Sequence, residues 1–221
     1  IASDYIIDSY NEIENRYNVL INFEKNISCG VITGVEQSFI GYLPIKEFLK
    51  LIKGADGNIR KNLFYENVRD FQGQNNAVNS EISSTLTDEK KIDKFHLLNN
   101  GVTIVAKEFS NIRSNEYEIC DYYIVNGCQT SNVIYHHAID IAESTSLNIP
   151  IKIVHTTDND VISSLIRSTN RQTPVPDEAF VSLEKFHKRL QEYYLRYSES
   201  CFEALYYERR SKEFSNGFNR V

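Results

Sequence analysis

The stretch DYYIVNGCQTSNVIY, residues 121–135, decides the fold because a strand, a turn and a helix follow one another in it without a gap. The apolar run at 121–125 is rich in β-branched and aromatic residues, which favour strands. Asn126 and Gly127 tolerate positive φ angles and therefore predict a turn. A helix is expected from about residue 129 to residue 142. This succession is typical of folds in which helices pack on a sheet.

Further strands and helices are predicted on either side of this stretch. Strands are expected at residues 18–24, 30–43, 63–65, 102–106 (VTIVA) and 149–154 (IPIKIV). Helices are expected at 45–52 after Pro44, at 76–86, at 91–98, from the N-cap Asp158 to Arg167, and from Pro176 to about Tyr197. The sequence therefore predicts an α/β or α+β fold with a mixed central sheet flanked by helices and a long C-terminal helix.

Composition predicts one compact unit. A chain of 221 residues with 41% hydrophobic residues is long enough for a sizeable core. We expect residues 1–61 to form an N-terminal segment packed with the rest, and residues 62–221 to form the main domain. Because the chain starts at Ile1 and not at methionine, we expect it to be truncated, and we take both ends to be incomplete. No apolar run approaches the roughly 20 residues of a spanning helix, so no membrane span is expected.

The four cysteines predict reduced thiols in the cytoplasm. They lie far apart and lack the spacing of a zinc site, so we expect no metal there: Cys29, Cys120, Cys128 and Cys201. The net charge of -6 argues against a globally basic nucleic-acid binder, although the acidic excess lies before residue 160. Local basic surface is therefore compatible with the C-terminal part.

Three polar clusters follow apolar runs and are the candidate binding site. They are Asn99-Asn100-Gly101, residues 126–130, and residues 167–173. We expect the three to converge into one pocket whose ligand-binding residues are Asn99, Asn100, Asn126, Gly127, Gln129, Thr130, Arg167, Asn170, Arg171 and Gln172. Amides, hydroxyls and two arginines suit a phosphate group or the edge of a nucleobase. The sequence thus predicts recognition of a nucleotide or nucleic acid, without a cofactor.

Each cluster also has a purely structural interpretation. Asn-Gly pairs form good turns by themselves, and arginines at the C-terminal end of a helix complement its dipole. Whether the protein is an enzyme stays open at this point. The alternative is a nuclease or nucleotide phosphohydrolase that uses Mg²⁺, with Glu66, Asp70 or Asp121 as metal ligands.

Six strings in one order resemble the abortive-infection phage-resistance family, abbreviated AIPR. They are NLFYENVRDFQG, FHLLNNGVTIVA, DYYIVNGCQTSNVIY, IPIKIV, IRSTNRQTPV and LYYERRSKEF. The resemblance runs from about Asn62 to Phe214 and implies a prokaryotic protein of antiviral defence, with another protein of the defence system as a possible partner. It implies nothing about oligomeric state.

A shorter likeness concerns the strand-turn-helix motif of ParB-like and DGQHR-type proteins, in which the turn faces phosphates. IVNGCQTSNVIY has the same layout, but Asn126 replaces the usual aspartate and Thr130 the usual arginine. The missing arginine removes a bidentate phosphate contact, so Arg167 or Arg171 would have to replace it.

Overall fold

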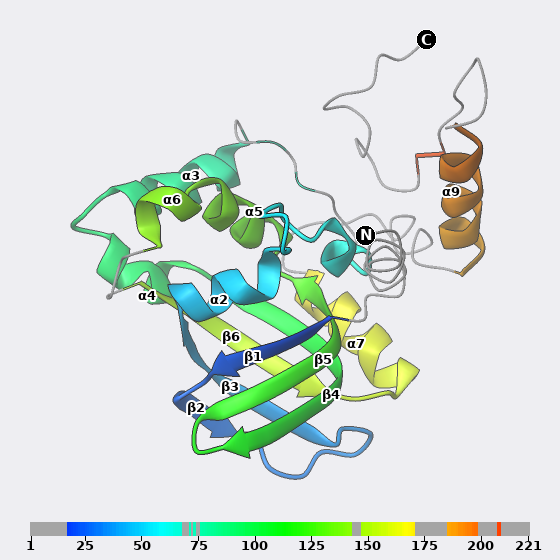
Figure 1. The fold of residues 1–221 in the computed structure, drawn as a ribbon, viewed down its shortest axis with the longest axis horizontal. Helices are drawn as coiled ribbons and strands as arrows, with labels where there is room; N and C mark the ends of the chain where they lie inside the picture. The colour runs from blue at the N-terminus through cyan, green and yellow to red at the C-terminus, as the bar shows by residue number, and fades with distance from the viewer. Residues whose placement is uncertain are drawn as a thin grey trace.

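The computed structural model describes residues 17–67, 71, 73, 76–142, 147–170, 185–198 and 207–208 of the chain. Its centre is a mixed six-stranded sheet with the strand order β1-β5-β4-β6-β3-β2 (Figure 1). The strands are β1 (Asn18–Asn22), β2 (Lys25–Ser28), β3 (Gln37–Pro44), β4 (Val102–Arg113), β5 (Glu116–Asn126) and β6 (Asn148–His155). Helices pack against this sheet, which confirms the predicted mixed fold.

The helices lie in the connections between strands and after β6, the last of the six strands. They are α2 (Ile45–Ile52), the 3-10 helix η1 (Lys61–Phe64), α3 (Ala77–Thr87), η2 (Ile92–Lys94), α4 (Phe95–Leu98), α5 (Cys128–His136), α6 (Ala138–Ile141), α7 (Asn159–Asn170) and α9 (Lys185–Ser198). Only β4 and β6 pair in parallel, whereas the other neighbouring strands pair antiparallel.

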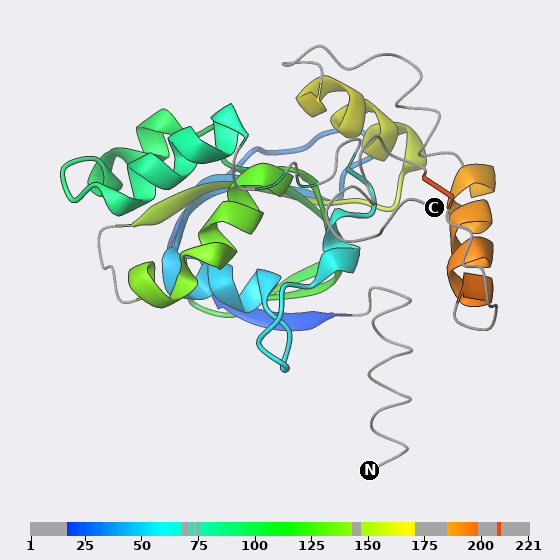
Figure 2. The same cartoon turned by 90° about the horizontal axis from the view of Figure 1, so that it is seen from above.

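The sheet is strongly curled, because its two edge strands are neighbours in the sequence. β1 and β2 lie at opposite ends of the strand order, yet only Phe23 and Glu24 connect them. Three Cα steps span at most roughly 11 Å, so the two edges must approach each other. The view from above shows the resulting ring of strands (Figure 2). Phe23 is fully buried at this junction, and its N–H donates to the carbonyl of Asn115 at 2.8 Å.

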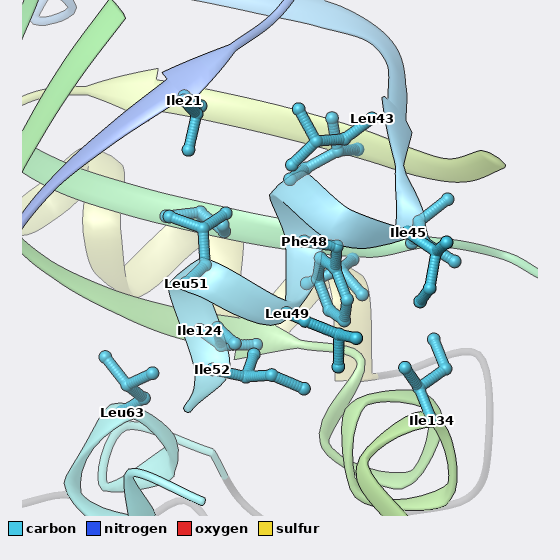
Figure 3. Packing of buried hydrophobic residues seen from close by; sticks show 14 of the residues in the cluster. Ile21, Leu43, Ile45, Phe48, Leu49, Leu51, Ile52, Leu63, Ile124 and Ile134 are labelled. Carbon is cyan, nitrogen blue, oxygen red and sulfur yellow. The ribbon is translucent and has the colours of Figure 1, made fainter. Parts of the chain in front are cut away.

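The main core fills the inside of the curl and is covered at one end by α2. Pro44 precedes this helix, and its buried side chains are Ile45, Phe48, Leu49, Leu51 and Ile52. They meet inward-facing residues of the strands, such as Ile21 and Ile124, together with Ile134 of α5 (Figure 3). A second, smaller core lies between the outer face of β4 and β5 and helix α7, where Ile166 packs with Val105 and Val125.

Most predicted elements are present, and several differ in extent. The prediction of a strand at 63–65 is wrong, since η1 occupies Lys61–Phe64. Residues 30–36 form a turn region before β3, and the predicted helix 129–142 is divided at His137 into α5 and α6. The predicted start of the C-terminal helix at Pro176 lies outside the described residues, which begin again with α9.

Among the described cysteines, Cys29 and Cys120 are free thiols, and Cys128 is buried. Burial raises the pKa of the Cys120 thiol, and the nearby Glu118 and Glu108 add to that effect. Within the described ranges, no helix combines the length and the apolar character needed to cross a membrane.

Candidate functional site

The two Asn-Gly turns of the sequence lie directly against each other. Gly101 has a φ of 78° and Gly127 a φ of 103°, so both adopt the left-handed conformation that glycine favours. A Cβ on Gly127 would lie 2.8 Å from Cγ2 of Val102 and 3.1 Å from the carbonyl oxygen of Gly101. A Cβ on Gly101 would lie 2.5 Å from the carbonyl oxygen of Pro150. The contact between the turns therefore needs glycine at position 127, whereas position 101 needs it for the approach to Pro150. The contact brings the first two polar clusters together.

A cavity of about 390 Å³ opens where these turns meet, and we call it the amide cavity. Helix α3, which lies beside α5 in both views, forms one wall (Figures 1 and 2). The polar side chains of its lining are Asn67, Glu81, Thr85, Asn99, Asn100, Asn126, Gln129, Thr130 and Thr169. Glu81 alone carries a charge among these described lining residues. Phe95, Leu98, Val78 and Ile82 supply an apolar side.

The first turn of α5 lies at this cavity. Gly127 precedes the helix, and no side chain in the described part of the protein caps it. The first intrahelical bond runs from the N–H of Ser131 to the carbonyl of Gly127 at 2.8 Å. Residues 127–130 line the cavity, so the positive end of the helix dipole lies beside it.

Some of the amides hold the walls in place. Asn99 donates from Nδ2 to Oγ1 of Thr130 at 3.2 Å, and its Oδ1 accepts from the N–H of Gly101 at 2.9 Å. Gln129 accepts through Oε1 from Nδ2 of Asn79, a buried residue of α3, at 2.9 Å. These three side chains therefore position the turn and α5 with respect to α3.

Asn100 and Asn126 differ from these three. Neither side chain makes a hydrogen bond to another described residue, although both line the cavity. Asn100 is exposed and Asn126 is half-buried. A ligand can therefore engage their amide groups without breaking a hydrogen bond to another described residue.

The third polar cluster reaches the cavity through one residue. Thr169, near the end of α7, lines the amide cavity, and its hydroxyl donates to the carbonyl of Leu165 at 2.7 Å. Arg167 is exposed on α7 and is not part of the lining. Asn170 ends α7, whereas Arg171 and Gln172 lie outside the described residues. The structure thus joins the first two clusters and places one member of the third beside them.

The two described carboxylates of the enzymatic alternative, Glu66 and Asp121, do not line this cavity. Glu66 pairs with Lys188 of α9, and Asp121 lies on β5, five residues before Asn126. Asp70 is outside the described residues. In the portion of the chain that the structure describes, no group of three or more His, Cys, Asp or Glu side chains is arranged for a metal ion. Burial, and secondarily the charge of Glu66, raises the pKa of Tyr123.

A second hollow of about 630 Å³ lies on the outer face of the sheet, and sequence reasoning missed it. We call it the outer-face cavity. Its lining includes two cations, Lys25 of β2 and Lys152 of β6, together with Tyr42 of β3. The lysine inside the apolar run IPIKIV could have indicated this outer face, because residues alternate between the two faces of a strand. An apolar strand with one cation at an outward position predicts a face that meets solvent or a ligand.

A model of the AIPR protein family matches residues 64–220 of the chain. The matched range contains both Asn-Gly turns, β4 to β6 and α7, whereas β1 to β3 and α2 precede it. Neither a curated protein nor a solved structure matches the chain.

Proposed function

The chain belongs to the AIPR family of abortive-infection phage-resistance proteins, and we propose that in this antiviral setting it recognises a nucleotide or nucleic acid in the amide cavity. The observation that carries the proposal is the meeting of two Asn-Gly turns at the N-terminus of α5 within one cavity. A phosphate group is the ligand best matched to the first turn of a helix, because backbone N–H groups and the helix dipole both favour an anion.

The side chains extend this match from the phosphate to the base. Asn100 and Asn126 each offer an amide oxygen and an amide NH₂ group, the donor and acceptor pair that reads a nucleobase edge. The apolar wall of Phe95 and Leu98 supplies a surface for the flat face of a base. A cavity of about 390 Å³ falls within the range of pockets that hold a small ligand.

The lining favours binding over bond cleavage. It holds many hydrogen-bond donors and, among the described residues, a single carboxylate, Glu81. General acid-base catalysis commonly uses two titratable groups with different tasks. We therefore place the chain among recognition modules, whose signal passes to an effector outside this segment.

The test is an equilibrium titration of labelled mononucleotides, RNA and DNA without Mg²⁺, using the intact chain and Asn126→Ala. Removing one hydrogen-bonding amide from a buried contact costs about 1–3 kcal/mol, so affinity should fall roughly 5- to 100-fold. Asn22→Ala is the matched control, because this exposed asparagine at the end of β1 lines neither cavity. Thermal melting of each variant checks that the fold is retained.

The same titration separates the other functions. Equal affinities of Asn126→Ala and Asn22→Ala would reject the amide cavity as the binding site. Release of phosphate or nucleotides that requires Mg²⁺ and is lost in Glu66→Gln would identify a nuclease or nucleotide phosphohydrolase instead. Binding of none of the nucleotides or nucleic acids would reject the proposal and point to a protein partner.

A further inference from the structure

The floor of the outer-face cavity is one row of side chains that crosses the sheet. Ile27 of β2 lies opposite Ile40, Ile40 opposite Lys152, Lys152 opposite Thr103, and Thr103 opposite Asn126. Directly paired residues on neighbouring strands share a face. All five line this cavity, so they form a continuous surface from the edge strand β2 to the end of β5.

This surface continues into the amide cavity. Asn100, Asn126 and Thr169 line both hollows, so the two adjoin at these residues, and we call them together the groove. The end of α7 borders the groove at Thr169. A ligand that fills the amide cavity can thus extend along the strands without leaving a lined surface.

The outer part of the groove combines flat apolar surface with positive charge. Ile27 is 76% exposed, Ile40 is 50% exposed, and Tyr42 is 40% exposed. The Tyr42 ring stands at 81° to the ring of His96, with centroids 5.4 Å apart, which fixes the orientation of the tyrosine. An exposed aromatic ring on a sheet surface is a platform on which an unpaired base can stack.

The charges of the lining favour an anion. Lys25 and Lys152 have no acidic partner among the described residues, and Glu24 is the one carboxylate among the described residues that line this cavity. Both lysines stand on outward positions of the sheet, two strands apart. Strand and residue spacing place their Cα atoms roughly 12 Å apart. Two separated cations along a groove suit a ligand with repeated negative charge better than a ligand with one phosphate group.

From these observations we propose that the groove binds a single-stranded nucleic acid, a proposal that rests on the function proposed above. One nucleotide occupies the amide cavity, and its neighbours lie along the outer face, where Tyr42 stacks on a base and Lys152 and Lys25 contact phosphates. A base enters the amide cavity only when it is not paired, so the strand must be single at that point.

The experiment measures fluorescence anisotropy of labelled RNA and DNA strands of about eight nucleotides, a length within the range that one such groove contacts. Mononucleotide and a duplex of the same sequence are the other ligands. The single strands should bind at least about tenfold more tightly than the mononucleotide, and the duplex should bind weakly. The RNA and DNA strands together show whether the 2′-hydroxyl contributes.

Lys152→Ala locates the binding to the outer face. It should weaken single-strand binding by roughly 5- to 10-fold and lower the slope of log affinity against log salt by about 1, while mononucleotide binding stays unchanged. Lys107→Ala is the matched control, because this exposed lysine of β4 lines neither cavity. Glu24→Gln should tighten binding by about twofold, since it removes the opposing carboxylate.

The two proposals fail in different ways. Equal affinity for mononucleotide and single strand, or equal effects of Lys152→Ala and Lys107→Ala, would overturn the extended groove and leave the amide cavity as a nucleotide site. If the unchanged chain binds no mononucleotide, or if Asn126→Ala binds it with unchanged affinity, the proposed function is overturned as well.

Discussion

At the scale of single residues, the buried tyrosine Tyr122 attaches the sheet to helix α2. Its hydroxyl donates to the carbonyl of Leu51 at 2.7 Å and accepts from Nη1 of Arg60 at 2.8 Å. Arg60 also donates to the carbonyl of Leu51 at 3.2 Å, and its guanidinium lies 4.5 Å above the centre of the Tyr17 ring. One phenol thus satisfies a carbonyl at the end of α2 and a cation at the same time.

This arrangement predicts a loss of stability at alkaline pH. Burial raises the pKa of Tyr122, and burial together with Glu66 raises that of Tyr123. Because both folded pKa values exceed the unfolded value of about 10, the stabilisation is fully present below pH of about 10 and is lost as the pH rises further. Urea unfolding at pH 8 and above pH 10 should show the free energy of unfolding falling.

Tyr122→Phe is the diagnostic variant for this prediction. The change should lower the free energy of unfolding at pH 8 by about 1–3 kcal/mol, because Leu51 and Arg60 lose a buried partner. It should also make the alkaline fall shallower. A variant whose fall is as steep as that of the unchanged protein would show that Tyr122 does not titrate as expected.

At the scale of elements, the pairing of β2 with β3 depends on a missing side chain. Asn26 lies opposite Gly41 in the register of these strands. A Cβ on Gly41 would approach Cα of Asn26 to 2.8 Å and Cε2 of Phe23 to 2.9 Å. Both distances are below those of ordinary carbon contacts. β2 can therefore pair this closely with β3 only because residue 41 is glycine.

Gly41→Ala should separate the two strands. We expect a loss of about 1–3 kcal/mol in the free energy of unfolding, the usual cost of adding a methyl group to a packed site. The displacement should also weaken single-strand binding, since Lys25 and Tyr42 lie on these strands. Urea unfolding and the anisotropy titration measure the two effects.

Gly54→Ala is the control for this prediction, because its Cβ would meet first the end of the Asp56 side chain, which can move. Similar losses of stability in both variants would mean that close approach at Gly41 is not the cause.

Elements with strong local signals were predictable from the sequence. Pro44 marks the start of α2, and Asp158 caps α7 by accepting from the N–H of Asp160 at 2.8 Å. The alternation and β-branched residues of β6 identify it without any knowledge of its neighbours. In each case the residues that form the element also carry the information.

Elements that depend on distant partners were not predictable in the same way. The sequence predicts a strand at Leu63 and Phe64, because a short apolar run indicates burial but does not distinguish a strand from a helix. Both are buried in η1. Shortly after this helix, the side chain of Asn67 donates to the backbone carbonyl of Ile124 on β5, as a neighbouring strand would. Residues 30–36 turn instead of extending, with positive φ angles at Gly30 and Gly34.

The candidate site also combines features that local sequence predicts with features that depend on distant partners. Both Asn-Gly pairs are recognisable as turns, but their contact arises from the antiparallel pairing of β4 with β5, which sets Thr103 opposite Asn126. The adjacent β6 then brings Pro150 against Gly101. Lys25 and Lys152 share a face only because β3 lies between their strands. Sheet order is a property of the whole chain, which local patterns do not contain.

At the scale of the whole molecule, an aromatic cluster holds the two edges of the curled sheet together. The ring of Tyr117 on β5 lies 5.0 Å from that of Phe109, 5.7 Å from that of Phe39 and 6.2 Å from that of Phe23. These residues come from three strands and from the link between β1 and β2. Phe23 thus joins the cluster from the link that crosses between the two edge strands.

Phe23→Ala should open this junction. Deleting a fully buried phenylalanine ring costs about 3–5 kcal/mol, and the fall in the free energy of unfolding should appear in urea titration. Leu20→Ala on β1 is the control, because Leu20 is 47% exposed and should cost much less. Amide hydrogen exchange should become faster in β1 and β2 together. Faster exchange in one strand alone would contradict a shared junction.

The curled sheet also delays the pairing of β1 during translation. Asn18 on β1 pairs with Cys120 on β5, so β1 is translated about a hundred codons before its partner strand. At elongation rates of about 5–20 residues per second, the delay lasts roughly 5–20 seconds. Throughout that interval Ile21 and Phe23, which are fully buried in the folded protein, lack the partner strand that buries them. We therefore expect the yield of native protein to depend on how well β1 is protected from aggregation during translation.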